Sequence, residues 1–247
     1  MSIENWIALA SSLVGMAAAI AAMLTVLEMR RQRRSLYKPE IALVTHNWEL
    51  CVSGESFSAA SWQLSRGEEE TKEKYLKRDI PVQVFNVGSG AGKDLVIKFS
   101  YDIKGFIDAL AIMKETRWTI KYNHPMLTLK EIATKYESFD MVANQEIHPR
   151  IAYLLPANTQ PEGISINLPS GYGLLMKAYF LSLCRVDTET LKQYSLPLPI
   201  EVTLESHDIE GNKCTARFKL QPEFNFVRKP DFSQSSNVVA SGFINVS

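Results

Sequence analysis

The feature that most constrains this chain is an uncharged apolar run near the N-terminus, from Ile7 to Leu27. A helix rises about 1.5 Å per residue, so a run of this length matches the roughly 30 Å hydrocarbon core of a bilayer. Trp6 precedes the run and suits a membrane interface. Four basic residues that suit the opposite interface follow it: Arg30, Arg31, Arg33 and Arg34. The sequence therefore predicts a single transmembrane helix with membrane lipid as its partner.

The charges on either side of the run predict its orientation. Before the run the chain carries Glu4 and no basic side chain, whereas the arginines all follow the run. Cytoplasmic flanks of membrane spans are enriched in lysine and arginine. We therefore expect a single-pass protein of the cell inner membrane, with its N-terminus outside and its C-terminal domain in the cytoplasm.

Three alternatives to a membrane anchor stay open at this point. A cleaved signal peptide usually places its positive charge before an apolar run of about 7 to 15 residues, and this chain differs in both respects. A buried helix of a soluble core rarely continues this far without a charge. An interfacial amphipathic helix would show a polar face, which this run lacks. The pattern favours the anchor over all three.

Small side chains recur along the predicted span. Ser11, Gly15 and Ala19 follow one another at intervals of four residues, which places them on one face of a helix. Such a stripe permits close approach of two helix backbones in a membrane. An alanine-rich span also carries small residues on its other faces, so the stripe is compatible with a homo-oligomer without requiring one.

The rest of the chain predicts a mainly β domain. Short alternating apolar segments indicate strands at residues 41–45, 81–87, 95–101, 151–156, 164–169, 173–180, 200–205 and 215–220. Asp102 is suited to cap a helix over residues 103–111, and the Thr128 and Glu131 pair has capping-box spacing for a second. Together these predict an α+β fold, with an antiparallel β-sandwich and two inserted helices.

The domain boundaries follow from the same patterns. Residues 1–36 form the predicted transmembrane anchor and basic juxtamembrane segment. Residues 37–229 form the predicted cytosolic β-sandwich-like domain. Residues 230–247 are polar and indicate a flexible tail.

A glycine-rich segment, residues 88–94, superficially suggests a phosphate loop. The Walker pattern needs a glycine where Val87 stands and a serine or threonine where Asp94 stands. The dinucleotide pattern needs a glycine where Lys93 stands. We therefore expect a hairpin turn with no bound nucleotide.

No other motif indicates a cofactor, a metal ligand or a catalytic residue. The four histidines include no pair at the spacing of a zinc-binding helix, and they do not combine with a cysteine cluster. The three cysteines suit a reducing compartment. With 27 basic and 27 acidic side chains the chain has no surplus of positive charge, so we expect no nucleic-acid partner. A site assembled from distant strands stays open, and with it a membrane-anchored enzyme.

The segment from Leu27 to Ile41 resembles a type of small bacterial membrane protein in which one helix precedes a cytosolic β domain. The stretches 153–156 and 208–212 resemble the same type. Some members serve as membrane sensors or effectors in antiviral defence, so the resemblance implies one of these roles and assigns no functional residue. The leading hypothesis is a non-enzymatic sensor or interaction module that responds to a protein or small ligand. The alternative is an effector that oligomerises and disrupts the membrane.

Overall fold

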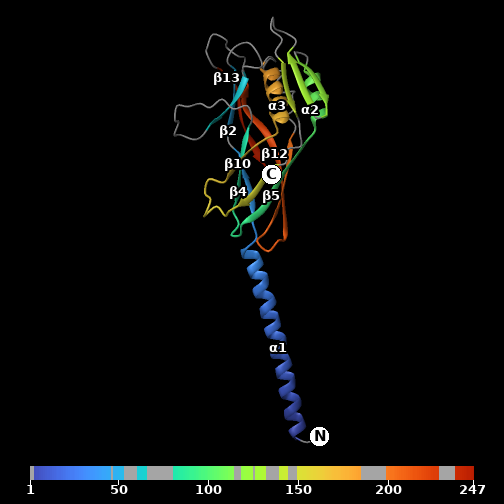
Figure 1. Cartoon of the computed structure of the whole chain (residues 1–247), viewed down its shortest axis with the longest axis vertical. Coiled ribbons are helices and arrows are strands. Elements are labelled where there is room, and N and C mark those ends of the chain that lie inside the picture. The colour runs from blue at the N-terminus through green and yellow to red at the C-terminus, as the bar shows by residue number, and fades with distance from the viewer. Residues whose placement is uncertain are drawn as a thin grey trace.

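A computed structural model describes residues 3–45, 47–52, 60–65, 80–113, 118–124, 126–131, 139–143, 149–184, 199–227 and 237–247. One long helix, α1 (Ile3–Leu36), projects away from a β-rich domain (Figure 1). Its 34 residues correspond to about 50 Å of helix. The described side chains along its length are exposed, so the alternative of a helix buried in a soluble core is wrong. By length and composition α1 is able to cross a membrane or to act as a signal sequence.

The domain has three antiparallel sheets in its described part. The first has the order β1-β4-β10, the second β3-β2-β13-β12-β11-β5-β9, and the third β6-β7-β8. Their bounds are β1 (Ile41–Val44), β2 (Asn47–Val52), β3 (Ala60–Ser65), β4 (Pro81–Asn86), β5 (Gly92–Tyr101), β6 (Trp118–Asn123), β7 (Met126–Glu131), β8 (Phe139–Ala143), β9 (Arg150–Leu154), β10 (Ile164–Asn167), β11 (Ile200–His207), β12 (Lys213–Val227) and β13 (Asn237–Val246).

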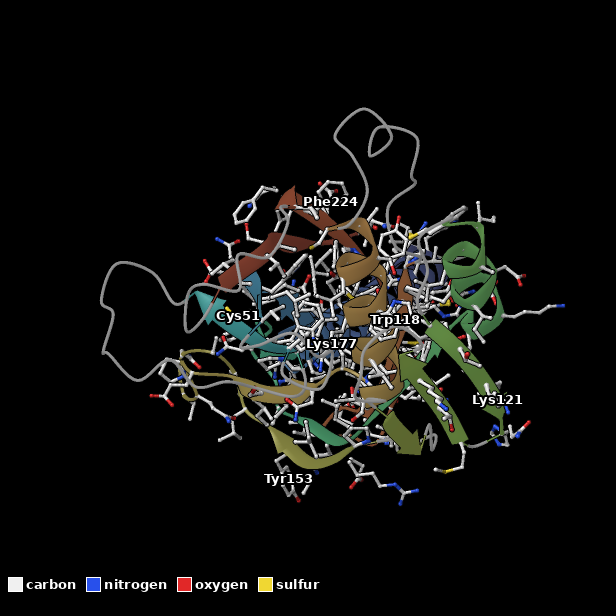
Figure 2. All side chains as sticks on the ribbon, turned by 90° about the horizontal axis from the view of Figure 1, so that it is seen from above. Cys51, Trp118, Lys121, Tyr153, Lys177 and Phe224 are labelled. Carbon is white, nitrogen blue, oxygen red and sulfur yellow. The ribbon has the colours of Figure 1, made fainter. Side chains whose placement is uncertain are left out.

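The seven-stranded sheet curves as a half-barrel around a central helix, α3 (Ser170–Leu183). Phe180 of α3 contacts Trp48 of β2 and Phe224 of β12, with ring centroids 4.6 and 6.2 Å apart. Near the start of α3, Tyr172 contacts Tyr101 of β5 at 5.2 Å. Figure 2 shows α3 in the middle of the domain, between this sheet and the strands that carry Trp118 and Lys121. The core of the domain therefore surrounds α3.

The structure confirms the mixed α+β class, the long N-terminal apolar helix and the mostly antiparallel sheets. It also confirms the helix after Asp102, α2 (Ile103–Ile112), whose capping carboxylate accepts a hydrogen bond from the Gly105 amide at 2.9 Å. The sandwich and the count of two inserted helices are not confirmed. A half-barrel wraps a helix instead of facing a second sheet of its own size. The described residues form three helices, α1, α2 and α3, and α3 was not among the two that were predicted.

Residues 173–180 were predicted as a strand and belong to α3. Every residue from Gly171 to Cys184 is buried, because the half-barrel covers one side of the helix and other elements cover the rest. A helix buried on all sides has no polar face, so its sequence lacks the 3.6-residue alternation that marks amphipathic helices. The apolar run alone does not distinguish such a helix from a buried strand.

The helix start predicted at Thr128 is also wrong, because residues 128–131 belong to β7. The rest of that predicted helix, residues 132–136, lies outside the described residues. Along β7, Leu127 and Leu129 are buried, whereas the alternate residues Thr128 and Lys130 are partly exposed. This two-residue alternation outweighs the local capping-box spacing, since it lets β7 cover the core between β6 and β8.

The flexible tail predicted from Pro230 is the third error, because Asn237–Val246 form β13. β13 pairs with β2 on one side and β12 on the other, which places it inside the seven-stranded sheet. Residues 230–236 of the predicted tail lie outside the described residues. The mixed polar composition of this segment did not indicate that it pairs with β2 and β12.

Candidate functional site at the junction of helix and domain

The connection between α1 and the β-rich domain is short and folded. The Tyr37 amide donates to the Arg33 carbonyl at 3.1 Å and continues the helical pattern for one residue. Pro39 is buried, and β1 begins two residues later at Ile41. Proline cannot continue the helix, and it restricts the residue before it to extended backbone. Residues 37–40, which we call the junction segment, therefore turn the chain from helix to strand.

Asn86, the last residue of β4, holds the junction segment in place. Its side chain is only 1% exposed. The Oδ1 atom accepts from the backbone amides of Glu40 and Gly88, both at 3.1 Å. The Nδ2 atom donates to the carbonyls of Gly90, at 2.6 Å, and Leu154, at 3.1 Å. A primary amide can donate two hydrogen bonds and accept two, so this side chain is fully used.

The backbone of Asn86 adds a further connection. Its carbonyl accepts a hydrogen bond from the Ala157 amide at 2.7 Å, and Asn86 forms an isolated parallel bridge with Pro156. One buried residue therefore links the junction segment, the glycine-rich segment, the end of β9 and the loop after β9.

The glycine-rich segment lies directly against the junction segment. A Cβ atom on Gly90 would stand 1.8 Å from the Tyr37 carbonyl oxygen, and one on Gly88 would stand 2.5 Å from the Glu40 amide nitrogen. Real Cβ atoms are excluded at such distances. The amides of Val87 and Gly88 both donate to the Glu40 carbonyl, at 2.7 and 3.3 Å. These glycines therefore permit two backbone segments to touch.

The hairpin interpretation of this glycine-rich segment is wrong. β4 belongs to the three-stranded sheet and β5 to the seven-stranded sheet, so the segment crosses between sheets. The residue with left-handed backbone is Asp94, at φ 51°, and not one of the three neighbouring glycines. Close approach to the junction segment, rather than turn geometry, accounts for Gly88 and Gly90.

The turn between β11 and β12 lies beside the same region (Figure 1). The Asp208 carboxylate accepts from the amides of Glu210 and Asn212, at 2.9 and 2.8 Å, and from the Asn212 side chain at 2.8 Å. Burial of Asp208 opposes ionisation, but these hydrogen bonds outweigh it and hold its pKa below the usual value. The Lys93 ammonium donates to the Ile209 carbonyl at 3.4 Å and connects this turn to β5.

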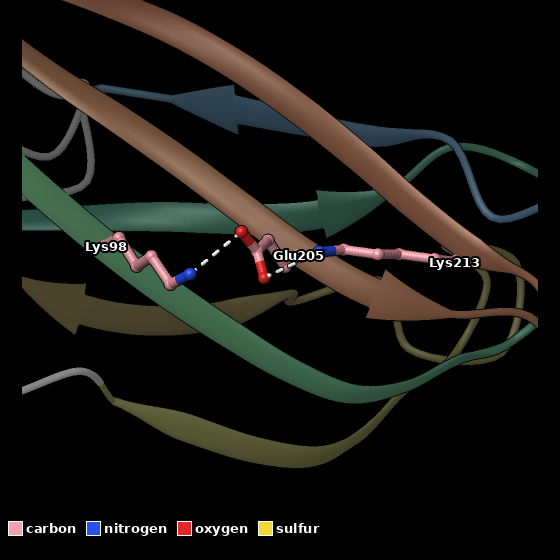
Figure 3. Close-up of polar contacts among 3 residues, drawn as sticks. All are labelled: Lys98, Glu205 and Lys213. Atoms are coloured by element: carbon pink, nitrogen blue, oxygen red, sulfur yellow. Dashed lines mark hydrogen bonds and ion pairs between the residues drawn. The ribbon is translucent and has the colours of Figure 1, made fainter.

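Further along the same strands, Glu205 binds two lysines (Figure 3). Its carboxylate oxygens lie 2.8 Å from Lys98 Nζ and 3.1 Å from Lys213 Nζ. The hydrogen bonds from Lys98 and Lys213 lower the pKa of Glu205. Ion pairs this exposed contribute little to stability. We interpret the three residues as a solvated part of the sheet surface.

The residues predicted for membrane contact lie on α1 and not in the junction. Trp6, Arg30, Arg31 and Arg33 are exposed, and Arg34 belongs to the helix. Ser11, Gly15 and Ala19 are exposed on α1, and nothing lies within 4 Å of a Cβ built on Gly15. The structure therefore leaves the small-residue stripe open to a neighbouring helix.

Sequence reasoning missed Asn86. The available signal was a polar residue at the end of an apolar strand, directly before a glycine-rich segment. It also missed Lys177, which lies on α3 and is buried (Figure 2). The described residues contain no group of three His, Cys, Asp or Glu side chains able to hold a metal ion.

Comparison with protein-family models, with curated proteins and with solved structures finds no match for this chain.

Proposed function

We propose that this chain is a single-span membrane protein that holds a non-enzymatic β-rich sensor or interaction module against the cytoplasmic face of the inner membrane. The observation that carries the proposal is the exposed apolar helix α1, joined to the domain by a short segment with a buried anchor at Asn86. A helix exposed along an apolar run of this length is costly in water and favourable in a bilayer.

The arginines support the orientation. About 1.5 Å of rise per residue places Arg30 to Arg34 roughly 20 to 25 Å from the midpoint of the apolar run, where headgroups begin to meet water. Cations at this depth are stabilised by anionic headgroups, and they are retained on the cytoplasmic side. The alternative of a cleaved signal peptide gains less support, because α1 continues without interruption through the arginines.

The junction supports a role in transmission as well as attachment. A flexible linker would allow the domain to reorient freely above the membrane. Here Glu40 uses both its backbone amide and its carbonyl in hydrogen bonds to β4 or the segment after it. A change in the domain around Asn86 would therefore displace the end of α1, which suits a module that reports binding of a protein or small ligand to the membrane.

The open stripe on α1 supports a second candidate, the oligomerising effector that disrupts the membrane. Gly15 has free space around it and Ala19 lies one turn further along the same face. Helices that associate through such residues gain dispersion contacts that lipid supplies less well. The resemblance to defence proteins is compatible with either candidate.

Induced toxicity separates the two candidates. The growth of cells expressing the unsubstituted whole chain is compared with that of cells expressing the Gly15→Leu variant, in which the stripe is blocked. Membrane crosslinking is measured in the same cells. The sensor proposal expects no loss of viability from the whole chain. Toxicity that falls together with crosslinking in Gly15→Leu would contradict it and support the effector. Ala17→Leu, on the opposite face of the same helix, serves as the matched control.

A further inference from the structure

Three large apolar side chains project into solvent at the end of the domain where α1 enters. Tyr37 is 45% exposed, Val87 57% and Ile209 42%. They come from the junction segment, the β4–β5 connection and the β11–β12 turn, and Figure 1 shows these three segments at the same end of the domain. We call these three residues the basal tips.

The backbone that carries the basal tips is held in place by hydrogen bonds. Ile209 lies in the turn that the Asp208 carboxylate holds with hydrogen bonds from the Glu210 and Asn212 amides. The Val87 amide is bound to the Glu40 carbonyl, which fixes its backbone against the junction segment. Turn positions of this kind favour polar residues, and an exposed isoleucine contributes nothing to the core. Its fixed position at a tip makes it available for contact with an apolar or interfacial environment.

The length of α1 places the basal tips near the headgroups. Leu36 lies 19 residues after Ala17, the midpoint of the apolar run, so an upright helix places it about 28 Å from the bilayer centre. The outer edge of the headgroups lies at about 20 to 22 Å. A tilt of about 40°, at the upper end of the observed range for membrane helices, lowers Leu36 to about 22 Å. Tilting α1 therefore brings the base of the domain to the lipid surface.

The charges at this base are mixed. Lys38 and Lys213 are exposed and Lys93 is partly exposed, but the acidic Glu40 and Glu210 are exposed as well. Attraction of lysines to anionic lipid is therefore partly cancelled by the carboxylates. Contact at this surface depends mainly on the apolar tips, so it should be less sensitive to salt than binding by a polybasic segment.

We propose that the basal tips rest in the headgroup layer of the phospholipid bilayer, so that the β-rich domain docks on the membrane surface beside its own span. This inference rests on the proposed function, because α1 must span the bilayer to hold the tips at this height. Docking gives the junction a defined geometry, in which a ligand that lifts the domain also changes the tilt of α1. The partner is the lipid surface itself.

The test uses the full chain reconstituted in phospholipid vesicles. Val87→Cys and Ile209→Cys are each labelled with an environment-sensitive fluorophore in a Cys214→Ser background, in which the remaining Cys51 and Cys184 are buried. Ile112→Cys is the control, because Ile112 is 73% exposed at the end of α2, away from α1 in Figure 1. Docking predicts a blue shift and a loss of quenching by aqueous iodide at 87 and 209, but not at 112.

A second variant separates lipid contact from local structure. In the chain labelled at Val87→Cys, the additional substitution Ile209→Ser should restore iodide quenching of the fluorophore at position 87. Ile112→Ser in the same labelled chain should leave the quenching unchanged. Both substitutions are at exposed sites, so the domain should remain folded. The protection should persist at high salt and when the chain is diluted in excess lipid.

The outcomes distinguish this inference from the proposed function. If the chain resists alkaline carbonate extraction but positions 87 and 209 are quenched as strongly as 112, the span stands and docking is wrong. If carbonate extracts the chain, both proposals fail. Protection that disappears on dilution with lipid would identify a second copy of the chain as the partner and would also overturn lipid docking.

Discussion

Replacing Asn86 by alanine should loosen the junction and destabilise the domain. The substitution removes two accepted and two donated hydrogen bonds from a buried side chain. Each is worth about 0.5 to 1.5 kcal/mol net, and a buried partner left unpaired costs about 1 to 3 kcal/mol. The hydrogen bonds from the Glu40 and Gly88 amides are only partly buried, whereas those to the Gly90 and Leu154 carbonyls are buried, so the losses do not add fully. We expect the free energy of unfolding to fall by about 3 kcal/mol.

Denaturant unfolding of the full chain in detergent, followed by fluorescence of the buried Trp48 and Trp62, measures this loss. Asn167→Ala, at an exposed position on β10, is the matched control and should change stability by less than about 0.5 kcal/mol. Proteolysis between Tyr37 and Glu40 should accelerate in Asn86→Ala alone. A loss below about 1 kcal/mol with unchanged proteolysis would refute the assignment of Asn86 as the anchor.

The aspartate variant adds a pH test of the same geometry. In Asn86→Asp one carboxylate oxygen replaces the donor that faces the Gly90 and Leu154 carbonyls. This oxygen can donate only when it is protonated, so folding should raise the pKa of the new carboxyl. The folded state then binds more protons than the unfolded state, and the stability of this variant should rise as the pH falls. A loss of stability on mild acidification, relative to the unsubstituted chain, would contradict the hydrogen-bond directions.

Four further outcomes follow. Gly90→Ala should destabilise the chain in denaturant unfolding, because its Cβ would overlap the Tyr37 carbonyl, and an unchanged midpoint would mean that the close approach is absent. Hydrogen bonds lower the pKa of Asp208 in the folded state, so its contribution to the free energy of unfolding is present above the unfolded pKa and is lost as the pH falls through the folded pKa. Asp208→Asn should therefore reduce the loss of stability at acid pH, measured by denaturant unfolding over a pH series. Gly15→Leu should leave membrane insertion intact and weaken any helix crosslinking, and equal crosslinking would exclude the stripe as the contact. Phe180→Ala should cost about 3 to 5 kcal/mol in unfolding free energy, and a cost below 1 would contradict its place at the centre of the core.

Parts of the fold that depend on local chemistry were predictable from the sequence. The hairpin of β11 and β12 follows from strict alternation on both sides of the Asp208 to Asn212 turn. The start of α2 follows from the Asp102 cap. The apolar part of α1 follows from the absence of charge between Ile7 and Leu27, whereas its extension through the arginines to Leu36 does not.

The rest depends on contacts between segments far apart in the sequence. α3 has no polar face because the half-barrel surrounds it, and β13 gains its neighbours only when residues about 190 apart pair, as Val238 does with Cys51. The junction was hidden for the same reason. Asn86 has partners at Glu40 and Leu154, on either side of it in the chain, and neither pairing leaves a local pattern. The sequence marks Gly88 and Gly90 as unusual, but it does not show that they contact the junction segment.

We propose that α1 crosses the membrane and that the β-rich domain lies on the cytoplasmic side. Labelling of engineered cysteines in bacterial cells with a membrane-impermeant maleimide tests this most directly. In a Cys214→Ser background, Ile3→Cys should react in spheroplasts with an intact inner membrane, and Ile112→Cys should react only after that membrane is permeabilised. Reaction of Ile112→Cys from outside the intact membrane, or recovery of the chain without its N-terminal helix, would contradict the account.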